Sequence, residues 1–360
     1  MSDLQKFFKG KKVLVTGHTG FKGAWLCQIL ILWGAQVSGI SLAPDTKQNM
    51  YSILNLKKKM SSHIADVRNF EKIKSIVAKE KPDIVFHLAA QPIVRESYDT
   101  PLYTVETNVM GTANMLEAIR FTPSVSAAVL ITTDKVYEDE QKNKLYTEDH
   151  KLGGHDPYSA SKAAAEIIIS SYRKSFFNPD NYKKTHRTLI ASVRAGNIIG
   201  GGDWAKDRII PDFVKAVFEK GEPLVVRNPK AVRPWQYILH PLYGYLLISK
   251  ELFLGNVEVS NAWNLGPSKK HHITVDKVLN QAIQHLGIGS FTISPDMTRH
   301  ETRHLGLDSA KARKYLGWRN SFSVGDSIRW TIEWYKNYYK KGDPVTFTKN
   351  QIASFFKHEL

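Results

Sequence analysis

A tyrosine and a lysine four residues apart, Tyr158 and Lys162, carry the clearest chemical signal in the sequence. Asp156 and Pro157 come just before them and are typical of a helix cap and a first helical turn. A helix that begins there would bring both side chains to one face. A lysine ammonium and the positive charge of a nicotinamide together favour the phenolate form of a tyrosine. We therefore expect Tyr158 to act as the base when a nicotinamide cofactor oxidises an alcohol.

A hydroxyl, a carboxylate and an ammonium follow one another shortly before this pair, in Thr133, Asp134 and Lys135. An acid and a second base beside an oxidation site allow a further proton-transfer step, and elimination of water is the step that we favour. A lysine can act as a base only when its pKa, ordinarily about 10.4, is strongly lowered. The alternative is that Lys135 only pairs with Asp134 or with a substrate phosphate.

Three glycines in the pattern Gly17-x-x-Gly20-x-x-Gly23 follow a predicted strand at 13–16 and open a predicted helix at 23–34. Glycines in this position permit a tight turn and let the backbone approach a pyrophosphate, which then lies against the helix N-terminus. The motif therefore predicts a bound dinucleotide.

The end of the second predicted strand, at 37–41, does not choose between the two nicotinamide dinucleotides. An acid there would bind the ribose of NAD and an arginine would suit NADP, but residues 38–44 contain neither. Asp66, after a short predicted strand at 62–65, is placed to accept a hydrogen bond from an adenine amino group. A turn or helix-cap residue is the alternative interpretation of Asp66.

Strands alternate with helices along the first half of the chain, which predicts a Rossmann-type, doubly wound parallel sheet of the α/β class. From about residue 200, Gly, Pro and Trp interrupt the alternation, so we expect a smaller C-terminal substrate-binding lobe. Residues 1–194 would form the NAD-binding domain with the catalytic residues, and residues 195–360 mainly the lobe, interleaved with the first domain. Further expected elements are helices at 70–79, 101–121 and 157–176 and strands at 84–88, 127–132 and 188–194.

Composition excludes several classes of protein. The 360 residues are 42% apolar, and Lys and Arg exceed Asp and Glu by 16. The basic residues are scattered, without the run expected of a nucleic-acid-binding arm, and no apolar stretch has the length of a membrane span. The single cysteine, Cys27, can form neither an intrachain disulfide nor a multi-thiol metal site. We expect a cytoplasmic enzyme without nucleic-acid partners or a bound metal.

Beyond these patterns, the chain resembles the extended short-chain dehydrogenase/reductase superfamily and, within it, the CDP-glucose 4,6-dehydratases. The superfamily resemblance rests on the residues at 13–23, 87–91 and 108–112, with Tyr158 and Lys162. The narrower resemblance rests on the segments at 133–135, 194–197, 200–204, 233–236 and 263–267. Sister epimerases usually have Ser or Ala at the position of Asp134, and related dehydratases commonly have Glu at that of Lys135.

The resemblance implies a lyase that converts CDP-glucose to CDP-4-keto-6-deoxyglucose through transient reduction of NAD. Tyr158, assisted by Thr133 and Lys162, would deprotonate the C4 hydroxyl while a hydride leaves C4. Lys135 would then remove the C5 proton as Asp134 protonates the departing C6 hydroxyl, and the hydride would return to C6.

The resemblance also implies a set of ligand-binding residues. Those expected to hold the cofactor, besides Tyr158 and Lys162, are Gly17, Thr19, Gly20, Phe21, Lys22, Gly23, Asp66, Ala89, Ala90, Gln91 and Asn108. Those expected to hold the nucleotide sugar are Asn197, Arg208, Arg233 and Arg303.

Partners and alternatives follow from the same resemblance. The helices at 101–121 and 157–176 would form the interface of a homodimer or a dimer of dimers, and the product would serve deoxysugar and cell-surface polysaccharide synthesis. One alternative is a 4,6-dehydratase or 4-epimerase that acts on another nucleotide sugar. The other is a non-catalytic NAD sensor, against which the acid and base residues argue.

Overall fold

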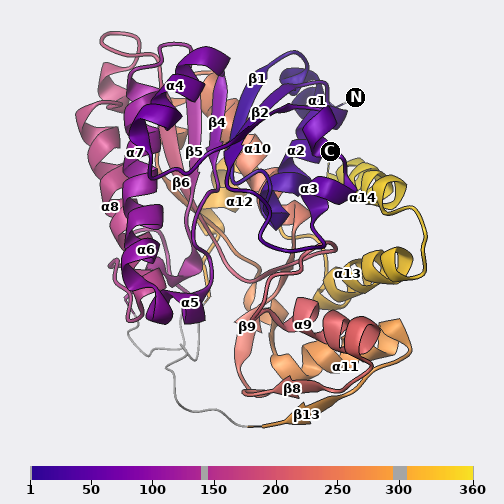
Figure 1. Cartoon of the computed structure of the whole chain (residues 1–360). Helices are drawn as coiled ribbons and strands as arrows, with labels where there is room; N and C mark the ends of the chain where they lie inside the picture. Colours follow the sequence, from indigo (N-terminus) through magenta and orange to yellow (C-terminus); the bar gives the residue numbers. More distant parts are fainter. Residues whose placement is uncertain (1, 139–144, 295–305, 360) are drawn as a thin grey trace.

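A seven-stranded parallel sheet dominates the computed structural model, which describes residues 2–138, 145–294 and 306–359 (Figure 1). The strand order is β3-β2-β1-β4-β5-β6-β11, and every neighbouring pair is parallel. This confirms the predicted doubly wound sheet. The strands are β1 (Lys12–Thr16), β2 (Gln36–Ser41), β3 (Ser61–Ile64), β4 (Ile84–His87), β5 (Ala127–Ile131), β6 (Leu189–Ala195) and β11 (Ala262–Leu265).

Helices cover both faces of this sheet because successive strand residues point to opposite sides. In β1, Leu14 belongs to one buried cluster, whereas Val13 and Val15 belong to the other. The first cluster is closed by α4 (Phe70–Glu80), α7 (Gly111–Arg120) and α8 (Pro157–Ser175). The second is closed by α1 (Asp3–Phe8), α2 (Phe21–Leu32), α10 (Leu239–Phe253), α13 (Val324–Tyr339) and α14 (Pro344–Glu359).

The helix predicted at 101–121 forms, but not as one regular α-helix. It consists of α6 (Pro101–Val105), a π-helical turn at Glu106–Met110, and α7, which ends at Arg120. The dinucleotide helix also differs from its expected bounds, since α2 begins at Phe21 with Gly20 as its N-cap. The remaining helices of the first half are short, namely α3 (Met50–Ile53) and α5 (Val94–Asp99).

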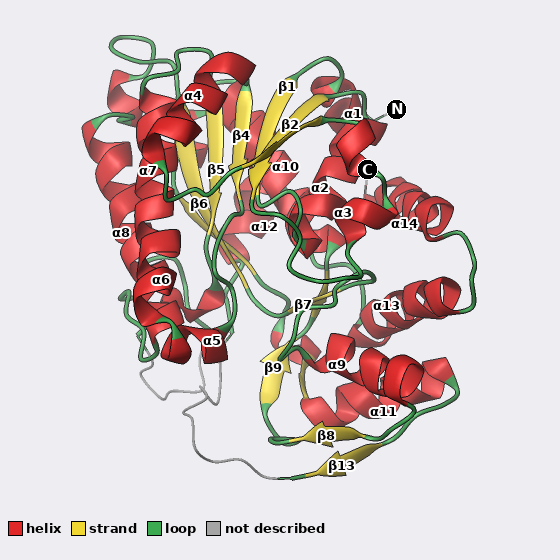
Figure 2. Cartoon of the chain, viewed as in Figure 1, coloured by secondary structure: helices red, strands yellow, loops and turns green. Residues whose placement is uncertain are grey.

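A smaller lobe lies beyond the carboxyl edge of the sheet and contains three two-stranded pairs (Figure 2). It is built largely from the second half of the chain, yet β11 returns from that half to the edge of the large sheet. The proposed division after residue 194 stays a prediction. The lobe and its surroundings contain α9 (Ile209–Lys215), α11 (Val275–Leu286), α12 (Ala310–Leu316), β7 (Ile198–Ile199), β8 (Leu224–Val226), β9 (Val232–Pro234), β10 (Gln236–Tyr237), β12 (His272–Thr274) and β13 (Phe291–Ile293).

The glycine-rich segment that follows β7 passes between helices at very close range. The backbone oxygen of Gly201 accepts a hydrogen bond of 2.9 Å from the indole of Trp25 on α2. A Cβ atom at Gly201 would lie 2.0 Å from Cγ of Trp334 on α13. Gly202 has a φ of +84°, in the left-handed region that favours glycine. The segment therefore packs α2, which opens at the dinucleotide motif, against α13.

Three further observations concern the described residues. None of their helices is both long and apolar enough to cross a membrane. Cys27 is a buried, free thiol in α2. Within the described ranges, no group of His, Cys, Asp and Glu side chains is arranged to hold a metal ion.

Replacing Gly201 by Ala is expected to destabilise the protein, because the new methyl group overlaps Trp334. Overpacking of this kind costs about 1–3 kcal/mol in the free energy of unfolding, which chemical denaturation would measure. Gly325→Ala is the control, since its Cβ would meet nothing closer than 3.6 Å and helix propensity favours alanine. An equal effect of the two substitutions would contradict the packing described for Gly201.

Candidate active site

The end of β5 carries the residues predicted to transfer protons. Thr133 caps a 3₁₀ turn at Asp134–Val136, and its Oγ1 accepts a hydrogen bond from the backbone N–H of Lys135 at 3.5 Å. The Thr133 hydroxyl donates to Oδ1 of Asp134 at 3.0 Å. The short turn thus places hydroxyl, carboxylate and ammonium next to one another.

Asp134 is nearly inaccessible to solvent, with 1% of its side chain exposed. Its Oδ1 lies 3.5 Å from Nζ of Lys135. Its Oδ2 is buried and has no hydrogen-bond partner among the described residues. A Cβ atom at Gly196 would lie 3.0 Å from that oxygen. Buried carboxylate oxygens are normally satisfied, so this one indicates a place where a ligand can bind.

Tyr158 enters the same region from the first turn of α8. Asp156 caps that helix by accepting hydrogen bonds from the backbone N–H and the hydroxyl of Ser159, at 2.9 and 2.6 Å. Burial raises the pKa of Tyr158 to about 12, whereas a hydrogen bond with Thr133 and the charge of Arg208 act to lower it. In the protein without ligands, the phenol is therefore the stable form.

Lys162 lies one turn further along α8, as the sequence predicts. Its Nζ donates a hydrogen bond of 3.2 Å to the backbone oxygen of Ile131, the last residue of β5. Burial lowers the pKa of Lys162 to about 8, although the carboxylate of Glu166 acts to raise it. The helix is consequently fastened to the strand that carries the proton-transfer turn.

The glycine turn between β1 and α2 has the shape that a pyrophosphate requires. Gly17 has a φ of +73°, and a Cβ atom there would lie 3.0 Å from the backbone nitrogen of Ala89. A Cβ atom at Gly23 would lie 2.1 Å from the backbone oxygen of Gly17. Gly20, the N-cap of α2, makes no side-chain hydrogen bond to the first helical turn. The backbone N–H groups of that turn can therefore bind an anion. These residues fit the phosphates of a dinucleotide.

Two further residues expected at the cofactor make protein contacts that bear on its ribose and adenine. The Thr19 hydroxyl donates to the backbone oxygen of Leu42 at 2.9 Å and lies 2.7 Å from Oγ of Ser41, at the end of β2. Asp66 pairs with Arg68 at 2.7 Å. Asp66 therefore forms an ion pair with Arg68, and its hydrogen bond with adenine stays a prediction.

Gln91 and Asn108 are buried and hold each other. Oδ1 of Asn108 accepts from the backbone N–H of Gln91 at 2.8 Å, and Nδ2 of Asn108 donates to the hydroxyl of Ser161 at 2.9 Å. Asn108 lies in the π-helical turn and so links the loop after β4 to α8. Ala89 and Ala90, half-buried in that loop, begin two residues after the end of β4.

Lys22 and Phe21 open α2 and are half-buried. The pKa of Lys22 is lowered to about 7, first by burial and then by the charges of Arg208 and Lys162. This influence places the Lys22 ammonium close to the proton-transfer residues, which its position in a phosphate-binding motif did not predict.

The residues expected to hold the substrate are placed as follows. Oδ1 of Asn197, two residues after the end of β6, is buried and has no hydrogen-bond partner in the described part of the chain. Arg208 pairs with Asp203 at 2.8 Å and acts on the pKa of Tyr158. Arg233, in β9, donates to the backbone oxygen of Val232 at 2.9 Å. Arg303 lies outside the described residues.

Sequence reasoning missed buried polar residues that contact the strands and the helix on which the site is built. Glu166 and Arg194 form a buried ion pair of 2.9 Å. His87 lies between two threonine hydroxyls, and burial lowers its pKa to about 3, so it is neutral. The one available signal was the spacing, since Glu166 lies four residues after Lys162 on the same helix face.

Residues 14–331 match the family model described as GDP-mannose 4,6 dehydratase. The chain belongs to that family. It is 42% identical over 352 residues to the CDP-glucose 4,6-dehydratase of Salmonella typhimurium, an alignment that covers 98% of both proteins.

Solved structures in the same fold include both dehydratases and epimerases. A UDP-glucose 4-epimerase from Thermus thermophilus in complex with NAD is 25% identical, with a TM-score of 0.76 over 90% of this chain and 98% of that one. DesIV, a dTDP-glucose 4,6-dehydratase from Streptomyces venezuelae with NAD bound, has a TM-score of 0.76 at 22% identity, over 92% of this chain and 99% of that one. At that identity, the second likeness shows the fold alone.

The charge of Arg208 gives a pH-dependent prediction. Because Arg208 lowers the pKa of Tyr158, Arg208→Gln should raise that pKa and move the alkaline rise of single-turnover substrate oxidation to higher pH. Arg208→Lys, which keeps a positive charge, should move it less. The measurement is the pH profile of cofactor reduction at saturating substrate.

Arg329→Gln is the control for this experiment, because Arg329 is a surface residue paired with Asp326 and Glu333 on α13. Identical pH profiles for Arg208→Gln and the unaltered protein would show that Arg208 does not tune Tyr158.

Proposed function

We propose that this protein is a CDP-glucose 4,6-dehydratase, a hydro-lyase that forms CDP-4-keto-6-deoxyglucose. Similarity to the Salmonella enzyme over 98% of both chains supports the substrate. The observation that carries the reaction type is the buried, unpartnered Oδ2 of Asp134 beside Lys135 and Tyr158. An acid and two bases at one site are what oxidation followed by elimination requires.

NAD is the cofactor. When bound, it would accept a hydride from C4 of the sugar, and it would be regenerated by the end of the cycle. The turn from Gly17 to Gly23 and the first turn of α2 would hold its phosphates. At the end of β2, the Thr19 hydroxyl and the nearby Ser41 hydroxyl offer hydrogen-bonding groups without a charge.

The first proton transfer belongs to Tyr158, which takes the proton of the C4 hydroxyl. Its phenolate must form although burial raises its pKa to about 12. The Arg208 charge favours the phenolate, and the Thr133 hydroxyl does so when it donates to Tyr158 in place of Asp134. Lys162, held against the end of β5, adds an ammonium on the same helix face.

The second pair of proton transfers belongs to Lys135 and Asp134. For this step Lys135 must be the neutral amine and Asp134 the carboxylic acid, the forms reached when the Lys135 proton passes to Asp134. The 4-ketone acidifies the C5 proton, which Lys135 removes, while Asp134 gives a proton to the C6 oxygen as it leaves as water. C6 then takes back the hydride that left C4, and C5 takes a solvent-derived proton, which gives the 4-keto-6-deoxy sugar. The two side chains are adjacent, at 3.5 Å, and Lys135 is the more exposed, at 24%. A base that reaches outward and a buried acid suit this division of roles.

A 4-epimerase is the second candidate, because the Thermus epimerase has the same fold. Epimerisation at C4 needs only the oxidation step and its reversal, so it gives no role to a buried carboxyl beside a lysine. Asp134 therefore favours the dehydratase. A non-catalytic NAD sensor would need neither Asp134 nor Tyr158.

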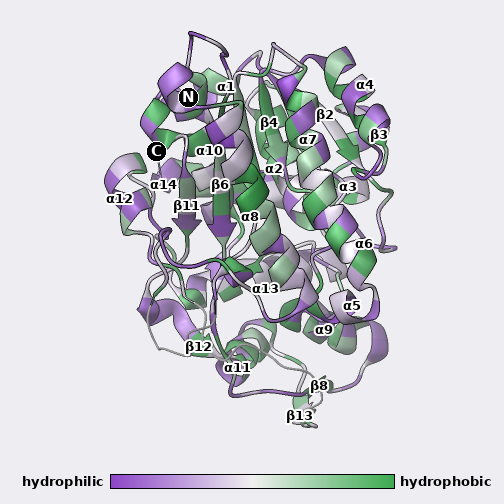
Figure 3. Cartoon of the chain, turned by 90° about the vertical axis from the view of Figure 1, so that its left-hand side faces the viewer, coloured by the Kyte–Doolittle hydropathy of each residue, from purple (hydrophilic) through white to green (hydrophobic). Residues whose placement is uncertain are grey.

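A homodimer or a dimer of dimers would form through the helices α6, α7 and α8, which face the viewer in Figure 3. Support comes from large apolar side chains that these helices and the π-helical turn expose. Leu102 is 78% exposed, Ile167 57% and Met110 52%. Apolar side chains that gather on one exposed face are typical of an interface.

Three broader assignments accompany the proposed activity. The division after residue 194 would leave the proton-transfer residues in the first domain and Asn197, Arg208 and Arg233 in the lobe. A cytoplasmic location suits the free thiol of Cys27. The product would enter deoxysugar and polysaccharide synthesis.

The activity is tested by incubating the protein separately with CDP-glucose, dTDP-glucose and GDP-mannose in heavy water, followed by mass spectrometry. CDP-glucose should lose one water and take up one solvent deuterium, because the C5 proton is exchanged during elimination. No mass change with any of the three would overturn the proposed activity and leave the family assignment standing.

Lys135→Met in the same assay separates the two chemical stages. Oxidation at C4 should persist and deuterium uptake at C5 should stop. Lys174→Met is the matched control, since Lys174 is exposed near the end of α8. Undiminished uptake in Lys135→Met would reduce Lys135 to a binding role.

The oligomer is tested by Leu102→Glu, which places a charge on the proposed interface. Sedimentation velocity should show a smaller assembly than for the unaltered protein, because an unpaired charge is costly to bury. Leu254→Glu, at a leucine that is 61% exposed after α10, should leave the assembly unchanged. The same sedimentation for all three proteins would place the interface elsewhere.

A further inference from the structure

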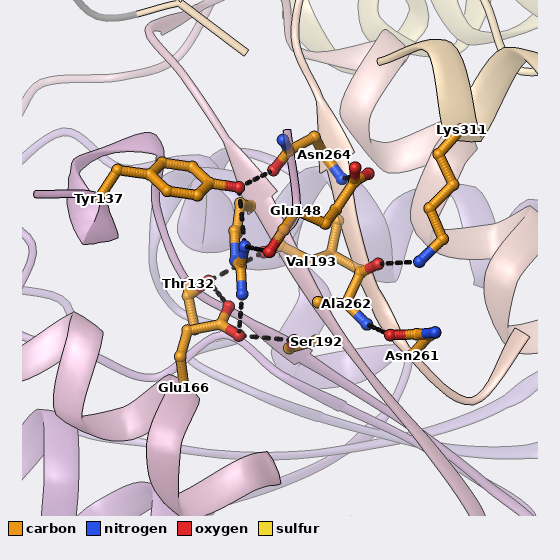
Figure 4. Close-up of polar contacts among 11 residues, drawn as sticks. Thr132, Tyr137, Glu148, Glu166, Ser192, Val193, Asn261, Ala262, Asn264 and Lys311 are labelled. Carbon is orange, nitrogen blue, oxygen red and sulfur yellow. Dashed lines mark hydrogen bonds and ion pairs between the residues drawn. The ribbon is translucent and has the colours of Figure 1, made fainter. Parts of the chain in front are cut away.

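A buried polar network surrounds the ion pair of Glu166 and Arg194 and reaches Thr132 and Tyr137, which lie on either side of the proton-transfer residues in sequence (Figure 4). The two side chains are only 2% and 4% exposed. Burying a charge pair contributes little net stability compared with apolar packing. The proposed chemistry uses neither group, so neither stability nor proton transfer explains why this ion pair is buried here.

The Glu166 carboxylate is saturated with donors from two strands. It accepts from the hydroxyl of Thr132 at 2.5 Å, from the hydroxyl of Ser192 at 2.8 Å and from Arg194 at 2.9 Å. Arg194 and these hydroxyls keep the pKa of Glu166 below its ordinary value despite burial. Glu166 therefore stays a carboxylate that fixes α8 to β5 and β6.

Arg194 continues the network toward the opposite end of the proton-transfer turn. Its Nη1 donates to the hydroxyl of Tyr137 at 2.7 Å and to the backbone oxygen of Glu148 at 3.0 Å. The Tyr137 hydroxyl donates in turn to Oδ1 of Asn264 at 2.7 Å. Nδ2 of Asn264 donates to the backbone oxygen of Tyr146 at 2.8 Å.

The contacts of the network lie on both sides of the proton-transfer turn in sequence. Thr132 directly precedes Thr133, and Tyr137 lies two residues after Lys135. The network therefore holds the proton-transfer turn at both ends. Glu166 lies on the helix face that carries Tyr158 and Lys162, at spacings of eight and four residues.

We propose that the Glu166–Arg194–Tyr137 network is a positioning device that fixes Asp134 and Lys135 relative to Tyr158 and Lys162. This inference rests on the proposed function. At one end of the network, Thr132 follows Ile131, whose backbone oxygen holds Lys162, so this end supports oxidation. At the other end, Tyr137 lies close in sequence to Lys135, so this end supports elimination. None of these positioning residues touches the substrate in this account.

Tyr137→Phe is the decisive variant, because it keeps the ring stacked on Tyr146, with centroids 5.0 Å apart, and removes only the linking hydroxyl. Misplacement by about 1 Å can slow a reaction on the order of 100-fold. Deuterium uptake at C5 and loss of water should fall by about 10- to 100-fold. Single-turnover oxidation at C4 should change by less than about twofold, as the Thr132 end of the network is intact.

Tyr237→Phe is the matched control, because its buried hydroxyl donates to Oε1 of Gln351 at 2.9 Å, far along the chain from this turn. It should lower the melting temperature about as much as Tyr137→Phe while leaving both chemical stages unchanged. Thr132→Val should slow oxidation, and Thr132→Ser, which restores the donor to Glu166, should recover it.

Amide hydrogen exchange, measured without substrate or added cofactor, supplies a readout independent of activity. The amides of residues 133–138 should exchange faster in Tyr137→Phe than in Tyr237→Phe. Equal exchange, or oxidation and elimination that fall together in Tyr137→Phe, would overturn the positioning role. Absence of dehydration by the unaltered protein would instead refute the proposed function. Failure of the positioning role and failure of the proposed function are therefore distinguishable.

Discussion

All strands of the large sheet run in the same direction, so their carboxyl ends and the loops that follow them meet at one edge. The glycine turn follows β1, the loop of Ala89 and Ala90 follows β4, and the turn of Asp134 follows β5. Asn197 follows β6. Residues distant in sequence are thereby gathered without long loops, and the smaller lobe lies beyond the carboxyl ends of the strands (Figure 2).

Burial where the strands end acts against ionisation of Tyr158, Lys162 and Lys22. It raises the pKa of Tyr158 to about 12 and lowers those of Lys162 and Lys22 to about 8 and 7. Glu166 and Arg194 escape because each neutralises the other. Burial therefore favours the neutral forms of Tyr158 and Lys22, and the neighbouring charge of Arg208 acts to lower the pKa of Tyr158 toward the range that the reaction needs.

Sequence patterns predicted the sheet, the glycine turn and the helix of Tyr158 because each depends on local features: alternation, turn chemistry and a capped helix start. The π-helical turn at Glu106–Met110 escaped prediction, because nothing in its composition distinguishes it from a regular helix. The ion pair of Glu166 and Arg194 also escaped, since it joins a helix and a strand 28 positions apart. Long-range pairing of buried charges leaves no local periodicity to read.

The close packing at Gly201 also constrains how this protein can change over evolution. The tryptophan ring at position 334 occupies the volume that any side chain at position 201 would need. A substitution at position 201 alone is therefore destabilising, and it becomes better tolerated once residue 334 has become small. The order of the two changes therefore matters, so the close packing of residues 200–202 constrains the history of the sequence as well as the present structure.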